Sequence, residues 1–244
     1  MTESLALVLF GDVVGSRRDS AGSTAWLREL VAELDTAYAP ARLAPFGFTQ
    51  GDELQGLLAA DADPIAAVLR AALGPEGRRM RWVVVRGPVD PDATGDAPAT
   101  ERTGPVFVAA RSAIDEARAG HERLVILTGQ PDVDALLSNL APALVDMLDG
   151  LTARQRTVAR MALIEDLRQS EVADRLNVRR ATISVSFNRA RVRSLQRLVA
   201  GIRRVYASGS GDPWREAGGT VAAADAEPAP RSVPADTQRK GAPS

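Results

Sequence analysis

Alternating strand-like and helix-like hydrophobic spacing along residues 4–127 is the feature that most restricts how this chain can fold. Strands are expected at 4–10, 46–50, 53–58, 80–86 and 123–127, and helices at 26–34, 64–73 and 106–119. The first helix has Ser23 as its expected N-terminal cap. This order predicts an α+β domain with a ferredoxin-like (split βαβ) antiparallel sheet. Helices are expected on one face, with one further helix and strand added at the end.

Composition and spacing divide the 244 residues into four parts. Residues 1–131 form the expected first domain, and leucines at helical spacing predict a connecting helix within 132–150. Residues 151–206 form a small all-α domain, described below. Residues 207–244 are rich in Gly, Ala, Pro and Ser with little to bury, so we expect a disordered tail.

The chain carries no membrane or export signal that its sequence reveals. It has no run of eighteen apolar residues and no basic, then apolar, N-terminal segment, so a cytoplasmic protein without membrane contact is expected. It has no cysteine and one histidine, His121, which leaves oxygen atoms as the expected ligands of any metal. Such a metal would be hard, as Mg²⁺ and Mn²⁺ are.

Charge is distributed very unevenly along the chain. Residues 1–151 hold 13 arginines against 22 acidic residues, a net charge of −9, whereas residues 152–206 hold 13 arginines against 4, a net charge of +9. A short segment this basic is typical of a nucleic-acid-binding surface, because each arginine can neutralise a backbone phosphate. The structural alternative is a solvated helical face that balances the acidic half.

Two aspartates follow strand-like stretches, in "VLFGDVVGSR" and "FTQGDELQG". In a split βαβ sheet the first strand is central and the hairpin lies beside it, so Asp12 and Asp52 are expected to be neighbours. Two close carboxylates repel unless a cation lies between them. The backbone N–H groups of Gly15 and Ser16, expected at a helix start, favour a phosphate. The two features together predict a site for Mg²⁺ or Mn²⁺ and a nucleoside triphosphate.

These stretches, with "TGPVFVAARSAI" and the C-terminal helical segment, resemble the SatD family over most of residues 4–200. The first domain is also similar, more distantly, to class III nucleotide cyclases, which match at Asp12, Asp52 and Arg111. The resemblance implies that the two aspartates bind metal and that the protein is a homodimer. With the turn it implies nucleotide or phosphate contacts from Gly15, Ser16, Arg17 and Arg111.

The sequence departs from the cyclases at two positions. Phe48 stands where they usually carry a purine-selecting lysine, and Phe107 stands where they usually carry a transition-state asparagine. Phenylalanine cannot donate a hydrogen bond to a base or to developing negative charge. Cyclase activity is therefore not expected, although metal and nucleotide binding are.

Each residue of this first site also has a structural interpretation. Gly15 and Gly51 can serve only to permit tight turns, and Asp12 can cap the helix that follows. Arg111 can pair with Asp12 or Glu53 and close the edge of the sheet. On this interpretation the domain is a scaffold that has lost its ligand.

The basic segment has the spacing of a helix-turn-helix. Ala173, Asn177 and Ile183 fall at the positions of the small crossing residue, the left-handed turn residue and the buried aliphatic residue. The segment also looks like region 4 of sigma factors. The residues expected to face outward toward DNA are Arg179, Arg180, Thr182, Ser184, Asn188 and Arg189. A purely structural or partner-binding helical trio would show the same apolar spacing.

Two functions follow from these patterns. The favoured one is a DNA-binding transcriptional regulator whose first domain binds a metal and nucleotide or serves as a dimerising sensor scaffold. The alternative is a metal-dependent nucleotide-processing enzyme with an accessory basic domain. Phe48 and Phe107 favour the regulator.

Overall fold

The computed structural model describes residues 4–16, 19–49 and 52–209, and these described residues form one compact unit. The strands are β1 (Ser4–Val13), β2 (Arg42–Phe48), β3 (Glu53–Ala59), β4 (Met80–Val89) and β5 (Leu124–Leu127). The helices are α1 (Ser20–Ala37), α2 (Ile65–Leu73), α3 (Pro105–Ala119), α4 (Pro131–Asp149), α5 (Ala153–Leu163), α6 (Gln169–Arg175), α7 (Arg180–Arg189) and α8 (Val192–Ser208). Two short 3₁₀ turns, η2 (Pro91–Ala93) and η3 (Ala99–Glu101), follow β4. The α+β class and the order of elements are as predicted.

The five strands form one sheet in the order β2-β3-β1-β4-β5. Neighbouring strands are antiparallel from β2 to β4, but β5 pairs with β4 in the parallel direction. The expectation of a wholly antiparallel sheet is therefore wrong at this edge. The physical reason is the connection: α3 carries the chain from the end of β4 back past the sheet, and a strand that follows such a crossover helix runs parallel to the first.

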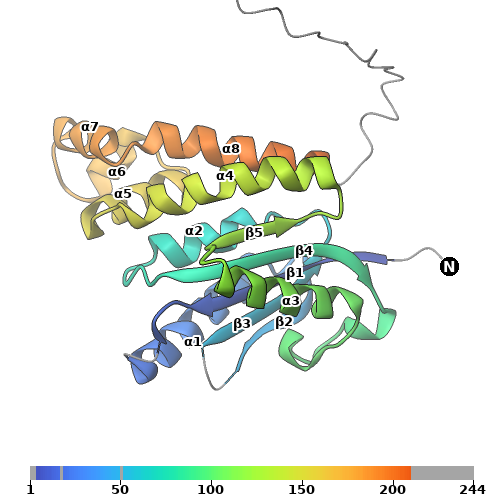
Figure 1. The fold of residues 1–244 in the computed structure, drawn as a ribbon. Coiled ribbons are helices and arrows are strands. Elements are labelled where there is room, and N and C mark those ends of the chain that lie inside the picture. Colours follow the sequence, from blue (N-terminus) through green and yellow to red (C-terminus); the bar gives the residue numbers. More distant parts are fainter. Residues whose placement is uncertain (1–3, 17–18, 50–51, 210–244) are drawn as a thin grey trace, which may run out of the picture. The chain divides into compact units, whose positions relative to one another are not determined.

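Helices cover both faces of the sheet, which corrects the expectation of helices on one face (Figure 1). Leu7 and Leu9 of β1 pack in the core shared with α1, α2 and α4, whereas Val8 and Phe10 pack in the core shared with α3. The cause lies in the central strands, which have apolar residues on both sides and so cannot leave either face to water.

The first helix begins earlier than predicted. Its cap is Asp19, whose carboxylate accepts a hydrogen bond from the Gly22 backbone N–H at 3.0 Å, and the predicted cap, Ser23, lies buried within the helix. The Asp19 carboxylate also accepts a hydrogen bond from Arg78 at 2.8 Å. A carboxylate at the N-terminus of a helix is favoured by the helix dipole, which explains why Asp19 takes the position.

Helices α5–α8 continue the core of the first half. Figure 1 shows α8 beside α4, and a single buried cluster extends from Leu7 of β1 to Tyr206 of α8. Polar contacts link the same parts, since Arg160 of α5 donates to Glu33 of α1 at 2.7 Å and Arg203 of α8 pairs with Asp63 at 2.7 Å. The helical segment is therefore packed against the sheet layer.

The predicted disordered tail began at residue 207, but α8 extends to Ser208. The rest of that segment, from residue 210, lies outside the described residues. Among the helices that are described, none combines the length and the apolar composition needed to cross a bilayer.

Candidate functional site

The sheet brings the two predicted aspartates together. Asp12 at the end of β1 lies opposite Glu53 at the start of β3, and the Val13 backbone N–H donates to the Asp52 carbonyl at 3.0 Å. The pKa of Asp12 is raised first by burial and further by repulsion from the nearby Asp52 carboxylate. Asp12 and Asp52 are therefore neighbours, as the split βαβ pattern predicted.

Arginines, however, surround the Asp12 carboxylate. Arg81, opposite Asp12 on β4, donates to Asp12 Oδ2 at 2.5 Å, and Arg118 of α3 lies 3.4 Å from the same oxygen. Burial raises the pKa of Asp12 above its usual range, Asp52 raises it further, and the charges of Arg118 and Arg81 lower it without cancelling the effect of burial. The two arginines therefore only partly offset the cost of burying the ionised Asp12 carboxylate.

Arg111 closes the edge of the sheet, as the structural interpretation proposed. It donates twice to the Glu53 carboxylate, at 2.9 and 3.0 Å, and lies over the Phe10 ring with its guanidinium carbon 4.6 Å from the centroid. Its side chain is 47% exposed. It therefore keeps donors that can reach a further acceptor.

The turn after β1 differs from the predicted phosphate loop. Gly15 has a φ of 78°, which glycine adopts readily, but α1 begins only at Ser20, so Gly15 and Ser16 are not at the helix start. The Ser16 hydroxyl donates to the Asp52 carboxylate. Arg17 and Gly51 lie outside the described residues. The alternative that Asp12 caps α1 is also wrong.

The two phenylalanines occupy apolar surroundings. Phe107 of α3 is buried in the core beneath that helix, and Phe48 at the end of β2 is half-buried against the other core. Neither side chain has a polar atom to offer a base or an oxyanion.

Sequence reasoning missed Arg81 and Arg118, which set the electrostatics of this site. Arg118 could have been found from Arg111, because two residues seven apart lie on the same face of a helix. Arg81 gave no local signal, since its pairing with Asp12 joins strands far apart in the chain. Within the described residues there is no group of three or more His, Cys, Asp or Glu side chains able to hold a metal ion. Binding of Mg²⁺ or Mn²⁺ at Asp12 and Asp52 stays a prediction.

The basic segment forms the predicted helix-turn-helix geometry. Asn177 has a φ of 50°, the left-handed conformation expected of the turn residue, and the Val178 backbone N–H donates to the Ala173 carbonyl at 3.0 Å. Ala173 and Ile183 are buried between the helices, as predicted. Upstream, Thr152 caps α5 in a reciprocal pair of hydrogen bonds with Gln155.

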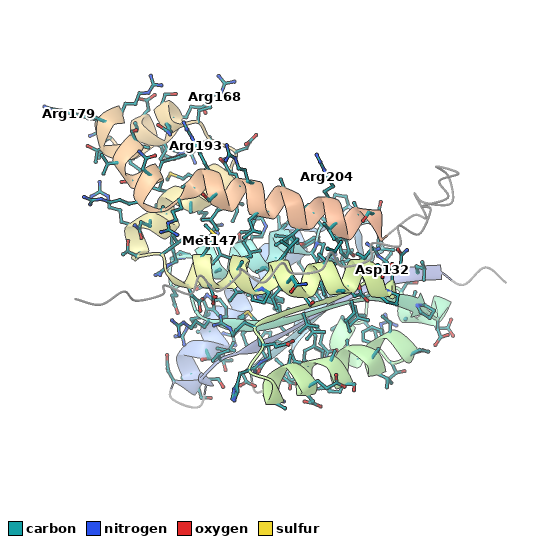
Figure 2. The ribbon with its side chains drawn as sticks, turned by 45° about the horizontal axis from the view of Figure 1, so that its top comes forward. Asp132, Met147, Arg168, Arg179, Arg193 and Arg204 are labelled. Carbon is teal, nitrogen blue, oxygen red and sulfur yellow. The ribbon has the colours of Figure 1, made fainter. Side chains whose placement is uncertain are left out.

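Helix α7 presents the predicted residues to solvent. Arg179, Arg180, Thr182, Asn188 and Arg189 are exposed, and Ser184 is half-buried. Figure 2 shows the Arg179 side chain at the end of the helical layer, pointing away from the protein. The exposed face also carries Val185, whose exposure is 49%, which sequence reasoning did not single out.

Most arginines of residues 152–206 have no acidic partner in the described part of the chain. Arg160, Arg175 and Arg203 form ion pairs, whereas no carboxylate lies within 4.0 Å of a second group of arginines. This group consists of Arg154, Arg168, Arg179, Arg180, Arg189, Arg191, Arg193, Arg197 and Arg204. Most of the positive charge of residues 152–206 is thus displayed on the surface, although Glu33 and Asp63 of the first half neutralise Arg160 and Arg203.

A groove of about 490 Å³ runs beside α7 on this surface. Arg154 and Gln155 of α5 form one wall, and Thr182, Val185 and Arg189 of α7 form the other. The groove extends the exposed face of α7 onto α5, a contribution that sequence reasoning missed.

A search for related proteins finds no family model, no curated protein and no solved structure that matches this chain. The resemblance to the SatD family therefore stays a prediction.

Proposed function

We propose that this protein binds double-stranded DNA through α7 and regulates transcription. The observation that carries the proposal is the exposed face of α7, a helix that follows a left-handed turn at Asn177 and displays Arg179, Arg180 and Arg189 without acidic partners among the described residues. A helix presented in this way fits the major groove of DNA. The purely structural alternative gives no reason to leave several neighbouring arginines unpaired.

The side chains on this face suit base edges as well as phosphates. Arginine can donate two hydrogen bonds to guanine, asparagine can pair with adenine, and the exposed apolar Val185 can contact a thymine methyl group. Phosphate contacts would come from the remaining arginines and would set the orientation of the protein.

The first half acts, in this proposal, as a ferredoxin-like, cyclase-derived scaffold that joins two copies into a cytoplasmic homodimer. The β2-β3-β1-β4 order, with antiparallel neighbours and with α1 and α2 on one face, supports the ferredoxin-like assignment. The dimer is implied by the resemblance to class III cyclases. Light scattering on the purified protein tests it.

Selection from a random pool of DNA duplexes with the full-length protein tests the DNA proposal. We expect one enriched sequence, and we expect Arg180→Ala to weaken its binding by about 1–3 kcal/mol. Arg204→Ala is the matched control, because Figure 2 shows this exposed arginine on α8 far from Arg179. No enriched sequence, or variants of Arg179, Arg180 and Asn188 that all bind like the parent, would overturn the proposal.

One observation favours a second candidate function, the binding of Mg²⁺ or Mn²⁺ with a nucleotide. The pKa of Asp12 is raised by burial and by Asp52, so a cation placed between these carboxylates would relieve an existing cost. Arg118, with a side chain 44% exposed, also pairs with Asp115 and Glu53, so it could keep these partners if a cation took its place at Asp12.

Thermal melts of the full-length protein with MgCl₂ and ATP test this second candidate. Stabilisation is expected in the parent and in the control Asp174→Asn, but not in Asp12→Asn or Asp52→Asn. If metal and nucleotide leave the melting temperature of all four proteins unchanged, the site does not bind them and serves only as part of the scaffold.

A further inference from the structure

A cavity of about 180 Å³ lies where α2, β4, α4 and α5 meet. Its apolar wall includes Val68 of α2, Trp82 of β4 and Leu148 of α4. Its polar wall consists of Arg78, Arg79, Arg123, Arg156 and a single acid, Asp149. The cavity is separate from the Asp12 site and from the exposed face of α7.

Two of the four arginines have their donors occupied. Arg78 donates to Glu76, Ser23 and Asp19, and Arg123 donates to the Met80 carbonyl and to Asp149. These two arginines are structural.

The other two arginines, Arg79 and Arg156, have donors to spare. Among the described residues, the Arg79 side chain makes one polar contact, from Nε to Asp149 at 3.3 Å, and the Arg156 side chain makes one, from a terminal nitrogen to the Leu151 carbonyl at 3.1 Å. Asp149 is already shared with Arg123. Arg79, Arg123 and Arg156 therefore face one carboxylate, which leaves the cavity with an excess of positive charge.

The Arg156 guanidinium is held in place without an acceptor for its Nε. That nitrogen is buried and has no hydrogen-bond partner among the described residues. Gly77, with a φ of 57°, lies against it so closely that a Cβ would be 2.4 Å from Nε. Arg70 and Arg160, on the facing helices α2 and α5, each have a buried nitrogen in the same condition. Gly77 covers this Nε, so an anion in the cavity would be bound by the terminal nitrogens of Arg156, of which only one donates, to the Leu151 carbonyl.

We propose that this cavity binds a small organic acid with an apolar body, of about the size of benzoate. The carboxylate accepts hydrogen bonds from Arg156 and Arg79, and the apolar body lies against Trp82 and Leu148. The volume suits such a ligand, since an apolar cavity of about 150 Å³ holds benzene. Inorganic phosphate has the charge but lacks the apolar body, whereas a neutral hydrocarbon has the apolar body but no charge to pair with the arginines.

Ligand binding would act on α5, the helix that precedes the α6–α7 pair. Arg156 belongs to α5 and Arg79 to the segment that leads into β4, so one ligand would tie α5 to the sheet layer. This regulatory role rests on the proposed DNA binding. Binding of an organic acid in the cavity does not depend on that proposal.

Calorimetric titration of the full-length protein with sodium benzoate tests the site, and tryptophan fluorescence, to which Trp82 contributes with Trp26 and Trp214, gives a second signal. We expect saturable binding in the millimolar range or tighter, weakened about tenfold or more in Arg156→Gln and for benzamide, the neutral analogue. Arg154→Gln, an exposed arginine on the same helix but outside the cavity, is the matched control and should bind benzoate like the parent. Arg79→Gln provides a second variant if Arg156→Gln does not fold.

Three outcomes would overturn the proposal: no saturable benzoate binding, equal binding of benzamide, or equal binding by the Arg156→Gln or Arg79→Gln variant and the Arg154→Gln control. Inorganic phosphate that competes as strongly as benzoate would refute the apolar contact. If no DNA sequence is bound, the proposed function fails, yet the titration still decides whether the cavity binds an acid.

Discussion

The Asp12 carboxylate accepts a hydrogen bond from the Arg81 guanidinium at 2.5 Å, and both side chains are buried between the ends of β1 and β4. Attraction in such a pair is opposed by the loss of hydration of both charges. At Asp12 burial has the larger effect, because its pKa is raised despite the presence of Arg118 and Arg81. The ionised Asp12 carboxylate therefore lowers the free energy of unfolding on balance, and this effect can be measured.

We expect Asp12→Asn to be at least as stable as the parent at neutral pH. The folded state holds the Asp12 proton more tightly than the unfolded chain, so the parent's free energy of unfolding falls as pH rises from the ordinary value of 3.8 through the raised folded pKa. In the Asp12→Asn variant the free energy of unfolding should not fall in this way. Urea unfolding across that pH range, with the exposed Asp174→Asn as control, measures the difference. A variant well below the parent at neutral pH would mean that pairing outweighs burial.

Arg81→Met should have the opposite effect. At neutral pH it leaves a buried carboxylate without its nearest cation, and we expect a loss of about 3 kcal/mol in the free energy of unfolding. The loss should shrink as the solution is acidified and Asp12 becomes protonated. The double variant Asp12→Asn/Arg81→Met should recover most of it. Equal losses in the single and double variants would show that Arg81 acts through its backbone contact with Glu122 instead.

DNA binding should depend steeply on salt. About five phosphate contacts would give a slope of roughly −4.5 in log K against log[salt], because each neutralised phosphate releases about 0.9 of a counterion. The candidates are Arg179, Arg180, Arg189, Arg191 and Arg193. Fluorescence anisotropy at several salt concentrations measures the slope. A flat profile would point to a protein partner for this surface.

Asn177→Val should destabilise the protein by about 1–2 kcal/mol, because a β-branched residue is strained at the left-handed φ of 50°. Asn177→Gly should cost little, since glycine adopts this conformation freely. Asn188→Val, at an exposed helical position, controls for the change in side chain. Equal urea midpoints for Asn177→Val and Asn177→Gly would show that the turn does not constrain this residue.

The whole chain up to α8 should unfold in one transition. The core cluster extends from β1 to α8, and Glu33 of α1 accepts hydrogen bonds from Arg70 of α2 and Arg160 of α5. We expect one calorimetric peak whose van't Hoff and calorimetric enthalpies agree. Glu33→Gln should lower stability by about 1–2 kcal/mol without splitting the peak. Two separate peaks would show that the sheet layer and α5–α8 fold independently.

Hydrophobic spacing in the sequence was enough to predict the order of the five strands and three α-helices of the first half, because periodicity is a local property. It did not fix their ends, since β2 begins at Arg42 instead of residue 46 and α1 at Ser20 instead of residue 26, and it gave no sign of the 3₁₀ turns η2 and η3. The left-handed turn at Asn177 was predictable for the same reason, since it depends on one residue and its immediate neighbours. The neighbourhood of Asp12 and Asp52 followed from the order of elements, which leaves few ways to arrange the sheet.

Apart from the pair of Arg111 with Glu53, which was one of the sequence alternatives, only the tertiary structure decided which charges meet. Arg81 lies 69 positions from Asp12 and Arg160 lies 127 from Glu33, and no local pattern links such pairs. The same holds for the cavity, whose Arg156 and Trp82 come from elements that touch only after folding. Spacing along the chain determines what each segment can form, whereas partners are chosen by the packing of distant segments, where burial and charge are balanced among all the groups present.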